Sequence, residues 1–190
     1  MLQHLNFLGR KQVSIFGADS LPRPVLKKLS SLLSGNNFSA ALNLDRTCLK
    51  TTRELLGQAG FSRLHFNLFG HDSKSHDSVV GPAGAFDKIM ESVEFLTEKR
   101  NENKISFGFN FFITPLNLKG LEQMTDFSGM MNLSFSAIAA NQLFKNTPSR
   151  LNCGPKTLKQ AKKILMQAAK NHDNIPSNIL SFKEIRTFEI

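Results

Sequence analysis

The sequence predicts an α/β fold, a partial (β/α) barrel of about five βα units with a parallel sheet. Apolar runs with the pattern of strands alternate along the chain with segments of helical periodicity, the order that covers a parallel sheet with helices. The 190 residues are enough for a substantial core but fall short of the roughly 200 to 250 residues of a complete barrel. Polar or glycine residues follow the strands expected at 64–68 and 107–114, where such folds place ligands.

Each element follows from its local pattern. Val13 to Gly17 is a short apolar run that ends in glycine, and the leucines after Pro24 recur at helical spacing as far as Gly35. The clearest helix is 86–99, because it carries one continuous apolar stripe. The other expected elements are strand 38–44, helix 49–59, strand 64–68, a polar loop over 70–85, strand 105–114, helix 118–127, strand 133–139 and helix 158–169.

The chain is expected to form one domain over residues 1–170, followed by a weakly patterned tail over 171–190. Within this tail, residues 179–190 are expected to add a final helical turn or an edge strand. No internal repeat is found beyond the βα alternation itself.

Composition narrows the function classes. A hydrophobic content of 41% is typical of a globular protein, and 17 Phe with no Tyr or Trp place the aromatic mass in cores. No apolar run approaches the roughly 20 residues of a membrane span, and the start lacks the order of a signal peptide. A cytoplasmic protein without a membrane partner is therefore expected. The net charge of +9 suggests an anionic partner such as RNA, but a solvated basic helix face is the simpler interpretation.

Three segments together carry a family resemblance. The first reads Gly17-Ala18-Asp19-Ser20-Leu21-Pro22-Arg23-Pro24, the second is the strand and turn of 64–70, and the third is Phe109 to Thr114 with Asn117. In order and spacing, over about 5–169, they resemble the radical S-adenosyl-L-methionine (SAM) family, especially its peptide-modifying, SPASM-like members. The resemblance implies a TIM-barrel-like fold that begins at the family's second strand.

The resemblance also implies a SAM site at the strand ends. The acidic residue of the first segment would hold the SAM amino group, and polar residues of the later strands would face the cofactor. Here Asp19 stands where the family usually has Glu, and Ala18 replaces a glycine, which restricts the approach of the backbone. The expected cofactor-binding residues are Gly17, Asp19, Asn67, Asn110, Thr114 and Asn117.

One departure from the family bears on chemistry. Radical SAM enzymes hold a [4Fe–4S] cluster through a Cys-x3-Cys-x2-Cys loop before the Gly-rich strand, with three thiolates leaving one iron open to SAM. No cysteine precedes Gly17, and the sequence contains only Cys48 and Cys153. We therefore expect neither a cluster nor reductive SAM cleavage on this chain alone, and SAM binding that is at most weak.

The pairs His71-Asp72 and His76-Asp77 suggest a metal site, since both residue types are ordinary ligands. Their five-residue spacing in a loop fixes no geometry, so capping of the next helix is the preferred interpretation. No catalytic residue and no metal ligand is predicted.

The preferred function is a truncated or degenerate radical SAM-like protein, and enzymatic activity is left open. One alternative is an accessory protein that uses the barrel wall to bind SAM, a peptide or a partner chain. The other is a basic α/β protein that acts on RNA, although nucleic acid is the less favoured partner. Expected partners are a chain that supplies the missing strand or cluster and a peptide or protein substrate. The sequence leaves open the substrate, the oligomeric state and whether Met1 is the true start.

Overall fold

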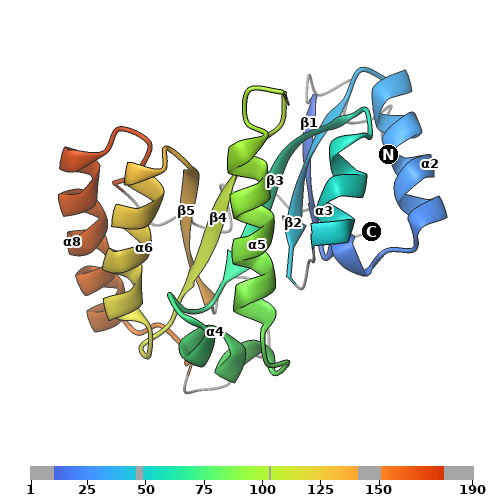
Figure 1. Cartoon of the computed structure of the whole chain (residues 1–190). Helices are drawn as coiled ribbons and strands as arrows, with labels where there is room; N and C mark the ends of the chain where they lie inside the picture. The colour runs from blue at the N-terminus through green and yellow to red at the C-terminus, as the bar shows by residue number, and fades with distance from the viewer. Residues whose placement is uncertain (1–10, 46–48, 103, 141–150, 178–190) are drawn as a thin grey trace. The chain divides into compact units, whose positions relative to one another are not determined.

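The computed structural model describes residues 11–45, 49–102, 104–140 and 151–177 (Figure 1). Its strands and helices alternate along the chain. They are β1 (Gln12–Phe16), the 3-10 turn η1 (Ala18–Ser20), α2 (Arg23–Gly35), β2 (Ser39–Leu44), α3 (Leu49–Leu56), β3 (Phe61–Leu68), α4 (Ser73–Val80), α5 (Ala85–Glu98), β4 (Ser106–Ile113), α6 (Leu118–Met130), β5 (Ser134–Ala139) and α8 (Pro155–Asn171).

The five strands belong to one sheet in the order β1-β2-β3-β4-β5. The pairs β1–β2, β2–β3 and β4–β5 are parallel. Sequential order with parallel pairing requires a crossover between neighbouring strands, and a helix lies in each of the four connections. The predicted α/β fold class, a partial (β/α) barrel of about five βα units, is confirmed. No helix in the described part of the chain is long and apolar enough to cross a bilayer.

The chain divides into two compact units, 1–66 with 88–107 and 67–87 with 108–190. In the first unit, β2 pairs with β1 from Gln12↔Ser39 to Phe16↔Asn43. Helix α2 contacts β2 and buries Leu26 and Leu33. Gly60 has a φ of 84°, and a Cβ there would lie 3.0 Å from the carbonyl oxygen of Ser30. Glycine therefore permits the close approach between α2 and the start of β3.

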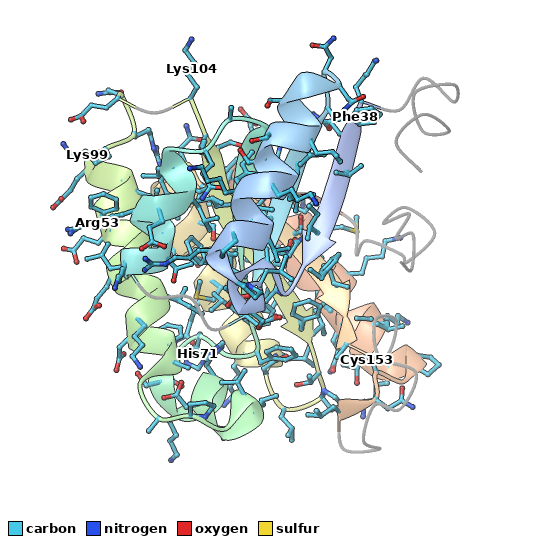
Figure 2. The ribbon with its side chains drawn as sticks, turned by 90° about the vertical axis from the view of Figure 1, so that its right-hand side faces the viewer. Phe38, Arg53, His71, Lys99, Lys104 and Cys153 are labelled. Atoms are coloured by element: carbon cyan, nitrogen blue, oxygen red, sulfur yellow. The ribbon has the colours of Figure 1, made fainter. Side chains whose placement is uncertain are left out.

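Helices α3 and α5 of the first unit also meet. The guanidinium of Arg53 lies over the Phe95 ring, with 4.8 Å between its carbon and the ring centre (Figure 2). Arg23 forms an ion pair with Glu54 that joins the start of α2 to α3. Because both pairs are at least partly exposed, they contribute modestly and mainly orient the helices.

The second unit is built around β4, which is buried from Phe107 to Ile113. The register with β5 is unbroken from Gly108↔Ser134 to Ile113↔Ala139. Helices α6 and α8 pack side by side (Figure 1). The apolar run predicted for this strand is therefore explained by burial on both faces, as in parallel sheets generally.

The largest difference from the sequence prediction is α4, which lies where a polar loop was expected. Its segment, Ser73 to Val80, buries only His76 and so shows no apolar stripe for periodicity to detect. The helix is nucleated by a capping box between Asp72 and Ser75. Helix α6 also extends three residues beyond its predicted end, and α8 begins at Pro155 rather than Leu158. The expectation for 179–190 falls outside the described residues.

Strand β1 is the first strand in the sheet order and pairs with β2 on one side. Within the described part of the chain no strand pairs with its other side. Unpaired edges of this kind are where a sheet accepts an additional strand.

Candidate functional site

The centre of the candidate site is a pair of buried amides in the second unit. Asn67 lies one residue before the end of β3, and Asn110 lies within β4. Their exposed fractions are 2% and 3%, and Asn110 Nδ2 donates a hydrogen bond of 2.9 Å to Asn67 Oδ1. Burying an amide costs free energy unless it is hydrogen-bonded. The bond between these two amides offsets part of that cost on two neighbouring strands.

Asn117 forms a second buried centre beside them. Its Nδ2 donates to the carbonyl oxygens of Phe69, at 2.9 Å, and Phe112, at 2.8 Å. Its Oδ1 accepts from the backbone N–H of Thr114 at 2.8 Å. The one amide thus joins the segment after β3, the end of β4 and the turn that leads into α6. Both of its N–H donors are used, so its role in the observed structure is to bind backbone.

Thr114 directly follows β4 and is also buried. Its Oγ1 accepts a hydrogen bond of 3.3 Å from the N–H of Leu116, which closes the same turn. In the second unit the structure therefore joins Asn67 to Asn110 and Thr114 to Asn117, and Asn117 is bonded to backbone two residues beyond Asn67 and Asn110. Direct contact of these side chains with SAM stays a prediction.

Phe69 links this amide network to α4. Its ring stacks on Phe112 with 4.8 Å between centres, and its N–H donates to His76 Nδ1 at 3.2 Å. The His76 ring is fully buried and lies 5.9 Å from the centre of the Phe86 ring. Burial lowers the pKa of His76, and its Nδ1 accepts a hydrogen bond, so the imidazole is neutral. Among the described residues His76 Nε2 has no hydrogen-bond partner.

Asp72 and Asp77, before and within α4, accept hydrogen bonds from the backbone at the starts of α4 and α5. Asp72 Oδ1 accepts from the N–H of Ser75 at 2.7 Å, and the hydrogen bonds from Ser75 lower the pKa of this carboxyl. Asp77 accepts from the N–H groups of Gly84, at 2.6 Å, and Phe86, at 3.0 Å, at the start of α5. Within the described residues, no three His, Cys, Asp or Glu side chains are grouped to hold a metal ion.

His71 lies between the end of β3 and α4 (Figure 2). Its Nε2 is 3.4 Å from Asp72 Oδ2, and its ring lies so close to Gly120 of α6 that a Cβ there would meet His71 Nδ1 at 2.6 Å. The glycine therefore makes room for the histidine ring. This packing adds a contact between the loop after β3 and the first turn of α6.

The remaining two predicted residues lie in the first unit, after β1. Gly17 has a φ of 66°, and its N–H donates to the Asn43 carbonyl at 3.0 Å. Asp19 Oδ2 accepts from the N–H of Asp45 at 3.1 Å. Both hydrogen bonds join the end of β1 to the end of β2, so Asp19 helps to hold these two strand ends together.

Asn43, one residue before the end of β2, is a further polar residue near the strand ends, and it was not among the predicted site residues. It is buried next to the end of β2, and its Nδ2 donates to the Ile15 carbonyl at 3.2 Å. The sequence did contain a signal, because Asn43 and Asp45 flank the end of a predicted strand just as Asn67 does. In the described part of the chain, β1, β2, β3 and β4 each have a polar side chain near or just beyond the strand end.

Cys153 does not have the surroundings of a cluster ligand. It is buried, and its thiol donates a hydrogen bond of 2.9 Å to the Ile113 carbonyl. Burial raises the pKa of the thiol, whereas iron–sulfur ligation requires the thiolate. Cys48, the other cysteine of the sequence, lies outside the described residues.

Comparisons with known proteins give a structural likeness. No model of a known protein family matches the sequence, and no curated protein matches it. A crystal structure of Streptococcus suis SuiB bound to the precursor peptide SuiA is similar in fold, with a TM-score of 0.71 and 13% sequence identity. The match covers 95% of this chain and 40% of the SuiB chain. At this identity the likeness establishes the fold alone, and the chain spans well under half of SuiB.

The buried His76 predicts a pH dependence of stability. Its pKa in the folded protein lies below the ordinary value of 6.5, so the unfolded chain takes up the proton first as the pH falls. The free energy of unfolding should therefore decrease as the pH drops from about 6.5 towards the lower folded pKa. His76→Asn keeps an acceptor near the Phe69 N–H but does not titrate, so its stability should change less over this range.

Urea unfolding between about pH 7.5 and 5 measures this difference. The matched control is Ser78→Ala, an exposed change on the same helix that removes no titratable group and should keep the slope of the parent protein. Equal slopes for the parent and for His76→Asn would contradict the assignment.

Proposed function

We propose that this chain is a degenerate or partial form of a radical SAM enzyme, which neither assembles a [4Fe–4S] cluster nor cleaves SAM on its own. Two findings support the family part of the proposal. The sequence resembles that family over three segments, and the fold is similar to that of SuiB over 95% of the chain. The observation that carries the chemical part is the set of cysteines.

A site-open [4Fe–4S] cluster needs three protein thiolates. The sequence supplies two cysteines, and one of these, Cys153, is buried with its thiol bonded to a backbone carbonyl. The residues present therefore do not fit the cluster, and no reductive step is assigned to them. A radical reaction would require cluster ligands from outside this sequence.

A second candidate function, binding without radical chemistry, is favoured by the amide network. Asn67, one residue before the end of β3, is hydrogen-bonded to Asn110 within β4, and parallel α/β folds bind ligands near the carboxyl ends of their strands. In the proposal Asn67 and Asn110 take polar groups of SAM, and Asp19 is assigned its amino group from the family resemblance alone. SuiB was crystallised with a precursor peptide. A peptide is therefore the second ligand class that we propose for the strand ends.

The cluster part of the proposal predicts a negative reconstitution. Incubation of the purified chain with iron and sulfide under anaerobic conditions should give no stable absorbance of a [4Fe–4S] centre, because two thiolates cannot hold one with an open iron. Iron and sulfide analysis after desalting measures this. A stoichiometric four-iron centre that survives in Cys153→Ala would overturn the cysteine argument altogether.

The binding part predicts weak affinity for SAM that depends on Asp19. Asp19→Asn keeps an oxygen that can accept the Asp45 N–H but removes the charge that would pair with the SAM amino group. Since hydrogen bonds to charged groups contribute about 1.5–3 kcal/mol, affinity should fall at least about tenfold. Titration calorimetry measures this against Asp126→Asn, an exposed control on α6. Tight binding that both variants share would show that the site is elsewhere.

A further inference from the structure

Helix α8 has one face covered by protein and one face open. Ala161, Leu165 and Ala168 are buried, and the helix packs against α6. Figure 1 shows α8 as the outermost helix beside α6 in the second unit. The side of α8 away from these three residues is exposed among the described residues.

The open side carries a single line of residues at intervals of three and four, here named the basic face. It consists of Lys156, Lys159, Lys163, Met166 and Lys170. Residues at these intervals lie above one another on a helix, so the line runs about 21 Å along the axis. All four lysines are exposed, and Lys162 lies beside the line.

No acidic residue offsets this charge within α8, from Pro155 to Asn171. In the part of the chain that the structure describes, none of the α8 lysines forms an ion pair. The neighbouring α6 carries exposed Glu122 and Asp126, yet they are not paired with α8 either. The lysine ammonium groups are thus available to a partner.

Exposed methionines accompany the lysines. Met166 is 50% exposed in the middle of the basic face. Met130 and Met131, 73% and 36% exposed, end α6 and follow Gly129, against which His172 lies just after α8. Methionine is flexible and polarizable and serves as an adaptable apolar contact on binding surfaces. The basic face thus offers a partner both unpaired positive charges and an apolar side chain.

We propose that the basic face of α8 docks an acidic polypeptide segment that carries apolar anchor side chains. Charge complementarity requires an anionic partner, and Met166 requires an apolar group on it. RNA is disfavoured because the face holds no Arg and no aromatic ring for stacking. A bilayer is disfavoured because α8 has buried its apolar side on α6 and cannot insert it. The inference does not depend on what the strand ends bind.

Fluorescence anisotropy with the full chain tests the proposal. The probe is a labelled 14-residue peptide in which Leu recurs every third or fourth position among Glu residues, and the comparison peptide has Ser in place of each Leu. We expect salt-sensitive binding of the Leu peptide, weakened about tenfold by the double variant Lys159→Glu with Lys163→Glu. Met166→Gln should weaken the Leu peptide severalfold and leave the Ser peptide unchanged.

The matched control is Lys88→Glu with Lys104→Glu, which removes the same charge from exposed lysines of the first unit. It should bind as the parent does, and circular dichroism should show all variants folded. Three results would overturn the proposal: equal weakening by the control pair, tighter binding of a 12-nucleotide oligouridine than of the Leu peptide, or tighter binding of phosphatidylserine vesicles. Absence of peptide binding at low salt would overturn it as well.

Discussion

The hydrogen bonds of the Asn117 side chain are the interaction on which the ends of β3 and β4 depend. One amide satisfies two carbonyl oxygens, of Phe69 and Phe112, and one N–H, of Thr114. Phe69 and Thr114 each directly follow a strand, and Phe112 lies one residue before the end of β4, near where the regular hydrogen bonds of the sheet end. A buried backbone group without a partner costs about 1–3 kcal/mol. Asn117 removes this cost at three places at once and fixes the turn into α6.

The same network extends through Phe69, which uses both of its backbone polar groups on side chains. Its carbonyl accepts from Asn117, and its N–H donates to His76. Stacking of its ring on Phe112 holds the segment from a third direction. Asn67 and Asn110 lie just before these groups on the two strands. These amides are therefore held by hydrogen bonds to other protein groups, and fixed polar groups of this kind are the preorganisation that a binding site needs.

The fold was more predictable than the site, and particular residues show why. Burial on both faces gives β4 a continuous apolar sequence, so its position could be predicted to within a residue or two. Helix α4 could not, because it is held by the Asp72 cap and by His76 rather than by an apolar stripe. The polar residues at strand ends were predictable as a group from the geometry of parallel sheets. The sequence could not show which of these residues bind backbone, because the partners of Asn117 come from segments up to 48 positions away.

The fold is similar to that of SuiB, but the cysteines of the sequence are too few for the cluster that the resemblance implies. The proposals for function rest on the lysines of α8 and the amides near the strand ends. Both are binding features, since one is an exposed charged surface and the other a buried polar network.

The most direct test of this account is the free energy of unfolding of Asn117→Ala. The substitution leaves two carbonyl oxygens and one N–H without their buried partner, so we expect a loss of about 2–4 kcal/mol and faster hydrogen exchange at Thr114. Asn171→Ala, on the exposed end of α8, is the control and should stay within about 0.5 kcal/mol of the parent. A loss at Asn117 no larger than that of the control would contradict the claim that this amide organises the strand ends.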